Sequence, residues 1–262
     1  MKPNPITVTI PLGHDRTITI ETGKLAKQAD GSVVVKCGGT MLLATVVSNK
    51  EAKEGADFMP LTVDYRENYA AAGRFPGGFL KREARPSEYE ILISRLIDRA
   101  MRPMFPDNYH ADTQVLVTLI SLDTEILPDA LACLAGAAAL AVSDIPIKEI
   151  ISEVRVSRVN GNFIVNPYRS EMEKSDMDFI IAATDKNLMM VEGEAKECSE
   201  ADLVKALEIA HEAIRIQVKA QEELRDLKGV KGKRDYTKPA TDEALKEKVF
   251  NVMYNKYAEL EK

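Results

Sequence analysis

Strand-like runs of β-branched and other apolar residues dominate the first part of the chain and return after residue 150. Short turns rich in glycine and asparagine separate many of these runs, which is typical of antiparallel hairpins. Two such turns are expected at Gly13-His14-Asp15 and at Asn160-Gly161. The pattern predicts strands over residues 6–10, 17–21, 32–36, 41–48, 57–64, 113–122, 154–159, 163–165, 179–183 and 188–192.

A helical spacing of apolar residues interrupts this alternation after residue 86. Ser87 and Glu90 form a capping box, so a helix is expected to start near Ser87. Its predicted buried face consists of Leu92, Leu96 and Ile97. The sequence therefore places a capped, amphipathic helix inside the strand-rich part of the chain.

Three further segments are also predicted to be helical. Pro128 opens an alanine-rich helix over 130–142, which is too short to span a membrane and is interpreted as buried in protein. Residues 199–227 form a long amphipathic helix, whose apolar stripe is interpreted as core rather than as a partner surface. A last helix is expected to begin at Thr241 and to reach Lys262 without a stop signal, so we expect a truncated chain.

Strands followed by helices in this order indicate an α+β protein. We expect a core domain over residues 1–230, a linker over 231–240, and the start of an all-α domain over 241–262. Apolar residues make up 45% of the 262 positions, which is enough for a sizeable core.

Composition also narrows the expected compartment. No apolar run approaches the length of a membrane span, and the N-terminus lacks the apolar stretch of a signal peptide. Cys37, Cys133 and Cys198 are odd in number and far apart, so they form neither a zinc-binding spacing nor a disulfide framework. We therefore expect no membrane association and a reducing compartment, the cytoplasm.

The segment 73–102 is basic, although the whole chain has a formal net charge of -6. Its cations are Arg74, Lys81, Arg82, Arg85, Arg95, Arg99 and Arg102. Such a concentration of positive charge in an acidic protein indicates a surface that handles a polyanion. Phe79 adds a flat apolar face beside Lys81 and Arg82. That combination suits single-stranded nucleic acid, whose bases stack while its phosphates are neutralised.

The arginines of the predicted helix admit two interpretations. Arg95, Arg99 and Arg102 recur at i, i+4 and i+7, which places them on one side of the helix. They could line a route for a polyanion, or they could form a solvated face in which Asp98 pairs with Arg102. Periodicity leaves both interpretations open, and the neighbouring basic loop favours the first.

The same segment carries a resemblance to a known family. FLKREARPSE followed by SRLIDRAMRPMF resembles the signature of the first ribonuclease PH-like core domain of the bacterial polynucleotide phosphorylase family. Further similarity lies in ITIETGKLAKQADGSV, ADFMPLTVDYREN and SDMDFIIAATDKNLMMVEGEA, so the resemblance runs over residues 6–227. The family loop usually reads Phe-Phe-Arg-Arg, whereas this chain has Phe79-Leu80-Lys81-Arg82. Since lysine lacks the two-point grip of arginine on phosphate, RNA contacts are expected to be weaker or more dependent on salt.

The resemblance implies the ribonuclease PH-like fold, a mixed sheet backed by helices, and a homotrimeric ring whose loops constrict a central channel. It implies single-stranded RNA as a partner, inorganic phosphate as a substrate of the full-length protein, and partners in an RNA-degradation complex. Mg²⁺ or Mn²⁺ would be held by a second core, which this chain does not contain.

At the positions that match the family's reaction centre, this chain has residues that do not suit the binding of phosphate or metal. The helix entrance over 123–129 has no serine or glycine run, and its carboxylates would repel a phosphate. Asp178 matches the second of two family aspartates, with Asp176 beside it, but Met172 stands at the first and cannot ligate a hard cation. A structural role in a turn before a strand explains Asp176 and Asp178 equally well. We therefore expect neither a catalytic residue nor a metal ligand in this chain.

The leading hypothesis is an RNA-binding, trimer-forming part of a phosphorolytic 3′-to-5′ exoribonuclease. The full-length protein would be a polyribonucleotide nucleotidyltransferase that releases nucleoside diphosphates during mRNA degradation, while this core alone would be inactive. The alternatives are a stand-alone active phosphorylase and a purely structural assembly module whose arginines form salt bridges between subunits. The residues predicted to bind RNA are Phe79, Lys81, Arg82, Arg85, Arg95, Arg99 and Arg102.

Overall fold

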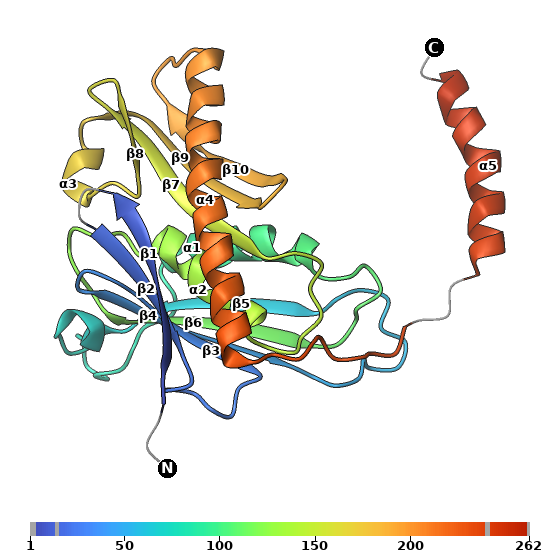
Figure 1. Ribbon diagram of the computed structural model, residues 1–262, viewed down its shortest axis with the longest axis horizontal. Coiled ribbons are helices and arrows are strands. Elements are labelled where there is room, and N and C mark those ends of the chain that lie inside the picture. Colours follow the sequence, from blue (N-terminus) through green and yellow to red (C-terminus); the bar gives the residue numbers. More distant parts are fainter. Residues whose placement is uncertain (1–3, 14–15, 239–241, 261–262) are drawn as a thin grey trace.

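Two β-sheets with packed helices form the body of the chain in the computed structural model, which describes residues 4–13, 16–238 and 242–260 (Figure 1). The first sheet has the strand order β1-β2-β3-β4-β6-β5. Its strands are β1 (Ile6–Gly13), β2 (Arg16–Thr22), β3 (Gly31–Cys37), β4 (Thr40–Ser48), β5 (Leu61–Glu67) and β6 (Thr113–Ser121). Neighbouring strands are antiparallel except β5 and β6, which run parallel.

Alternating apolar residues place one face of this sheet in the core. Val35 of β3 and Ala44 of β4 have no exposed surface there. The helix α2 (Asp129–Ala141) packs on this face, and all of its residues are buried. The close approach requires Gly31, because a Cβ at this position would lie 2.1 Å from the carbonyl oxygen of Ala139. The alanine-rich helix is therefore a central element of the core, as predicted.

The second sheet has the strand order β10-β9-β7-β8. Its strands are β7 (Ile151–Val159), β8 (Asn162–Val165), β9 (Ser175–Thr184) and β10 (Leu188–Ala195). The predicted turn between β7 and β8 is confirmed, and Asn160 and Gly161 both adopt left-handed backbone conformations, with φ of +51° and +78°. Asparagine and glycine tolerate that conformation best, which explains why they occupy this turn.

The long helix α4 (Glu200–Lys228) contacts strands of both sheets (Figure 1). Ser199 caps the helix, since its Oγ accepts a hydrogen bond of 3.1 Å from the backbone N–H of Asp202. Ala210 and Ile214 of its apolar stripe have no exposed surface. The interpretation of this stripe as core is therefore confirmed, and so is the α+β class.

Some element predictions were wrong in detail. The strand expected over 57–64 begins only at Leu61. Within α1 (Glu88–Met101), Leu92 is 57% exposed, whereas Ile93 is 2% exposed. Apolar residues lie on more than one side of α1, and packing against β5 and α2 selects the side that contains Ile93. The sequence did not predict the short elements η1 (Tyr69–Ala72), η2 (Arg102–Met104) and α3 (Arg169–Met172).

The last helix, α5 (Glu243–Leu260), stands apart from the body at the end of the segment that follows α4 (Figure 1). Many of its apolar side chains are exposed, among them Val249 and Phe250. The domain limits at residues 230 and 240 stay a prediction. Among the described helices, none combines the length and the apolar character that crossing a bilayer requires.

Parts of two predictions lie outside the described residues. These are His14 and Asp15 of the first predicted turn, and the predicted ends of the last helix at Thr241 and Lys262.

Candidate nucleic-acid interface

The basic loop, defined as residues 68–86, connects the end of β5 to the start of α1. Phe79 is 99% exposed, and Lys81, Arg82 and Arg85 are exposed as well. These three cations make no hydrogen bond or ion pair within the described residues. The turn around Phe79 contains two left-handed residues, Gly78 and Lys81, with φ of +75° and +52°. The loop therefore presents an aromatic ring and unpaired positive charges together.

The base of the loop is held by one carboxylate. Glu90 accepts a hydrogen bond of 2.9 Å from the backbone N–H of Glu67 and one of 2.6 Å from the backbone N–H of Ser87. Ser87 Oγ accepts in turn from the N–H of Glu90 at 3.2 Å, so the predicted capping box is confirmed. Burial opposes the charge on Glu90, but these backbone hydrogen bonds outweigh it and lower the pKa of Glu90. The sequence did not predict the contact with Glu67, because the two residues lie on different elements.

The three α1 arginines have different surroundings. Arg95 is exposed and makes no hydrogen bond or ion pair within the described residues. Arg99 forms an ion pair with Glu192 of β10. Arg102 pairs with Asp98 at 2.6 Å and donates to two backbone carbonyl oxygens at or just before the start of β5. The pairing of Asp98 with Arg102, which the sequence left open, is present. A role of the three arginines in RNA binding stays a prediction.

A cavity of about 590 Å³ lies between α1 and the second sheet. Leu92, Arg95 and Arg99 line it from α1, and Asp178 and Glu192 line it from the sheet. Leu92 is thus exposed to this cavity rather than buried against β5. The cavity brings Arg95 and Arg99, two of the predicted RNA-binding arginines, next to Asp178.

A polar cluster lies at this position, between α2 and the second sheet. The guanidinium of Arg155 forms ion pairs with Asp129, at 2.6 Å, and with Asp178. Ser157 donates to Asp178 at 2.8 Å, and the other oxygen of the Asp129 carboxylate accepts from the N–H of Ala130 at the helix start. Burial opposes the charge on Arg155, but Asp129 and Asp178 outweigh it and raise its pKa. The carboxylates of Asp129 and Asp178 are therefore both neutralised by a guanidinium of the same chain. That these positions correspond to the phosphate and metal sites of the family stays a prediction.

Asp176 is engaged as well. It forms a two-point ion pair with Arg158, with distances of 2.8 and 2.9 Å, and Arg158 also pairs with Asp202 of α4 at 2.8 Å. Met172 ends the short helix α3. Among the described residues there is no group of three or more potential ligands that could hold a metal ion.

Next to this cluster, the buried carboxyl group of Glu153 lacks hydrogen-bond partners in the described part of the chain. It is 1% exposed, and neither carboxylate oxygen makes a hydrogen bond of ordinary geometry within the described residues. Burial raises the pKa of Glu153 well above its usual value, and Asp129 raises it further, while Cys133 and Arg155 lower it only in part. Burial therefore favours the neutral form of this carboxyl group.

Arg155, Glu153 and Ser157 were not predicted from the sequence as residues of this cluster. They alternate along β7, so they share one face of a strand whose other residues are mainly apolar. Polar residues at every second position of a buried strand were the available signal.

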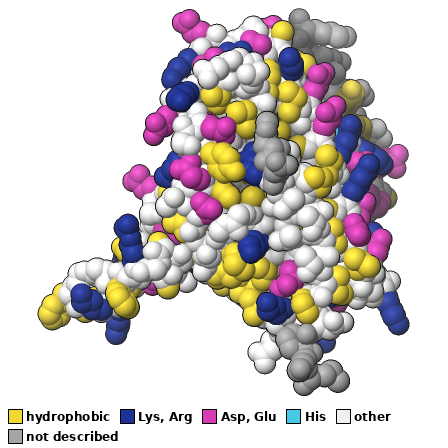
Figure 2. Space-filling view, turned by 60° about the vertical axis from the view of Figure 1, so that its left-hand side comes forward, with side chains coloured by type: hydrophobic (Ala, Val, Ile, Leu, Met, Phe, Trp, Pro, Cys, Tyr) yellow, Lys and Arg dark blue, Asp and Glu magenta, His cyan; other side chains and the backbone are white. Residues whose placement is uncertain are grey.

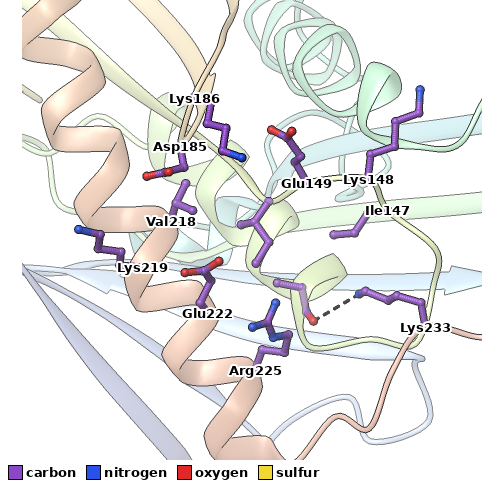
Figure 3. Close-up of a pocket in the computed structure, with 12 residues that line it drawn as sticks. Ile147, Lys148, Glu149, Asp185, Lys186, Val218, Lys219, Glu222, Arg225 and Lys233 are labelled. Atoms are coloured by element: carbon purple, nitrogen blue, oxygen red, sulfur yellow. Dashed lines mark hydrogen bonds between the residues drawn. The ribbon is translucent and has the colours of Figure 1, made fainter.

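A second cavity of about 580 Å³ lies between α4 and the segments around residues 147–150 and 185–186 (Figure 3). Figure 3 shows lysines and acids mixed along it, with Lys233 at one end. Lys233 donates to the carbonyl oxygens of Leu140 and Ser143, at 3.0 and 2.9 Å, and burial lowers its pKa to about 8. No residue predicted to bind RNA lines this cavity.

Figure 2 shows basic and acidic side chains interspersed over much of the face that it presents.

Two family models match the chain. They are the 3′ exoribonuclease family, domain 1, over residues 14–146, and the 3′ exoribonuclease family, domain 2, over residues 149–213. The chain therefore belongs to the 3′ exoribonuclease family.

Among curated relatives, the polyribonucleotide nucleotidyltransferase of Bacteroides fragilis is 58% identical over 253 residues, 97% of this chain and 36% of that protein. The enzyme of the same name from Cytophaga hutchinsonii is 56% identical over 256 residues, 98% of this chain and 35% of that protein. The chain thus spans about a third of the length of the curated relatives it matches. The resemblance inferred from the motifs is confirmed.

A solved structure of the Archaeoglobus fulgidus exosome with RNA bound to the active site matches with a TM-score of 0.60 and 18% identity. The match covers 81% of this chain and 86% of that chain. The likeness is one of fold, and it confirms the predicted ribonuclease PH-like architecture.

Proposed function

We propose that this chain is the RNA-binding, trimer-forming part of a phosphorolytic 3′-to-5′ exoribonuclease that takes part in mRNA degradation. The observation that carries the proposal is the exposed ring of Phe79 beside cations that no acid neutralises within the described residues. A ring that stacks on a base and cations that hold phosphates are the two parts of a single-strand binding surface. The curated relatives, named polyribonucleotide nucleotidyltransferases, support the reaction class.

The binding mode follows from the side chains of the basic loop. Phe79 stacks on a base, while Lys81, Arg82 and Arg85 contact the phosphates on either side. Lys81 binds as a point charge and Arg82 as a planar fork, so the lysine contact is the more sensitive to salt. In a homotrimer, three copies of this loop would converge on one strand.

This core performs no chemistry of its own in the proposal. A metal ion does not fit the donors that are present, because Asp178 is engaged by Arg155 and Ser157. An incoming phosphate would meet the carboxylate of Asp129 at the start of α2. Phosphorolysis to nucleoside diphosphates, with inorganic phosphate and Mg²⁺ or Mn²⁺, is assigned to a second core of the longer protein. We place that protein in the cytoplasm, with partners of an RNA-degradation complex.

The alternative of a purely structural module has support on α1 only. Arg99 and Arg102 each pair with an acid of the same chain, which suits bracing as well as it suits RNA binding. The alternative of a stand-alone phosphorylase would require nucleoside diphosphate release by this chain alone, when it is supplied with RNA, phosphate and a divalent metal.

The test replaces Lys81 and Arg82 together by alanine and measures the binding of a single-stranded oligoribonucleotide across a salt series. We expect weaker binding and a slope of log affinity against log salt that is shallower by roughly 0.7 for each phosphate that the variant no longer neutralises. The matched control replaces Lys24 and Lys27, two exposed lysines on the segment after β2, by alanine. Equal affinity and slope in the Lys81/Arg82 variant and the wild type would refute the proposal.

A further inference from the structure

The basic loop is tied at its base but not at its tip. Within the described residues, no side chain of 75–82 makes a hydrogen bond or an ion pair, and Phe75 and Phe79 are 91% and 99% exposed. The base is held by Glu90, whose carboxylate joins the last residue of β5, Glu67, to the capping residue of α1, Ser87. The two ends of the loop thus meet at one side chain.

A second carboxylate, that of Glu83, joins the two sides of the loop closer to its tip. Glu83 accepts a hydrogen bond of 3.1 Å from the backbone N–H of Tyr69, across the width of the loop. Ser94 ties α1 to β5 as well, because its Oγ donates to the carbonyl of Glu90 and accepts from the N–H of Tyr65, at 2.8 and 2.9 Å. Several hydrogen bonds at and near Glu90 therefore hold the base of the loop together.

Glu90 is buried, at 9% exposed, and Ser87 Oγ donates to it at 2.8 Å in addition to the two backbone N–H groups. A side chain that only capped α1 would need the contacts to Ser87 alone. The further bond to Glu67 does nothing for the helix, and it fixes the distance between the ends of the loop.

We propose that Glu90 is a positioning residue of the RNA interface, which holds the basic loop ready for a single strand without touching it. The inference rests on the proposed function, since it assigns a role within the same surface. Holding the ends in place lowers the conformational entropy that RNA binding must remove from the loop. Loosening the ends should weaken binding even though every cation of the loop is still present.

The sign of the effect separates positioning from electrostatics. Glu90→Gln removes a negative charge close to a polyanion surface, so charge alone predicts tighter RNA binding. Glutamine also turns an N–H₂ group toward donors that need an acceptor, so the tie between Glu67 and Ser87 cannot form completely. Positioning predicts binding that is weaker by roughly fivefold, the equivalent of about one hydrogen bond, with an unchanged salt slope.

The matched control is Glu88→Gln. Glu88 lies in the same first turn of α1, is exposed, and makes no hydrogen bond or ion pair within the described residues. Its replacement changes the charge and the interaction with the helix dipole as the replacement of Glu90 does, but leaves the tie intact. A third variant, Glu90→Asp, keeps the charge and is one methylene shorter, so it can cap α1 but cannot span to Glu67. This variant keeps the test usable if Glu90→Gln folds poorly.

The experiment measures oligoribonucleotide affinity at two salt concentrations, together with amide hydrogen exchange of residues 67–87, for these variants and the Lys81/Arg82 double alanine variant. The inference is supported if both Glu90 variants bind more weakly and exchange faster at Glu67, while Glu88→Gln binds as well as the wild type or better. It is overturned if the Glu90 variants bind like Glu88→Gln while the double alanine variant is weakened, and the proposed function then stands. If the double alanine variant binds as the wild type does, the proposed function fails, and the role of Glu90 fails with it.

Discussion

Two charged regions of this molecule, the basic loop and the polar cluster around Arg155, hold their cations in opposite states. On the loop, Lys81 and Arg82 are exposed and have no acidic partner within the described residues. In the cluster, Arg155 lies between Asp129 and Asp178 and is shielded from solvent. A cation already paired with buried carboxylates gains little from a phosphate, whereas an unpaired one gains its full interaction. Pairing, rather than the number of arginines, decides which region can bind a polyanion.

The largest expected effect comes from breaking the cluster. Arg155→Met leaves Asp129 and Asp178 next to each other without a counter-charge, so the free energy of unfolding should fall by about 3–5 kcal/mol. Chemical denaturation monitored by circular dichroism measures it. Arg82→Ala on the loop is the control and should stay within about 0.5 kcal/mol of the wild type. Similar decreases in the two variants would mean that the two regions do not differ as described.

The aromatic part of the loop is tested by Phe79→Ala. Removing one stacked base should cost about 1–3 kcal/mol of RNA binding, roughly fivefold or more in affinity, with an unchanged salt slope because the ring carries no charge. Phe58→Ala, at a phenylalanine that is 66% exposed outside the loop, should leave binding unchanged. An oligonucleotide titration followed by fluorescence anisotropy measures both, and an equal effect of the two substitutions would argue against stacking on the loop.

The smallest expected effect concerns the buried carboxyl group of Glu153. Because burial raises the pKa of Glu153, the folded chain keeps this proton at pH values where the unfolded chain has released it. The contribution of this group to the free energy of unfolding is therefore complete below the ordinary pKa of a glutamate. It is lost as the pH rises toward the raised pKa. Glu153→Gln cannot ionise, so its stability relative to the wild type should be greater at pH 6 than at pH 5, by about 1 kcal/mol.

Thermal unfolding at the two pH values measures that difference. Glu149→Gln, at an exposed acid just before β7, is the control and should show no comparable pH dependence. A Glu153 variant whose stability relative to the wild type is the same at both pH values would show that the group is not neutral in the fold.

Local chemistry explains which parts of this fold could be predicted from the sequence. The Asn160-Gly161 turn and the Ser87 capping box need only neighbouring residues, and both are confirmed. The composition of the basic loop is also a local property. The buried side of α1 is not, because apolar residues surround Leu92 and Ile93, and only packing against other elements decides between them.

The contacts of the candidate site were harder to predict for the same reason. Arg155 meets Asp129 of α2 and Asp178 of β9, which are distant in sequence, and only the pairing of β7 with β9 brings them together. The bond from Glu67 to Glu90 likewise requires β5 and α1 to be docked. Spacing along the chain carries no information about such contacts until the topology is known.

The parallel pairing of β5 with β6 has a consequence for how the molecule is made. The whole of the basic loop and α1 lies between each residue of β5 and its partner in β6. The two strands can therefore align only after this crossover has been synthesised. Non-local pairing of this kind forms slowly, because a long stretch of chain must close before any contact rewards it. A nascent chain that has emerged only as far as η2 therefore carries all the charges of the predicted RNA-binding surface, but not yet β6, the strand that pairs with β5 beside this surface.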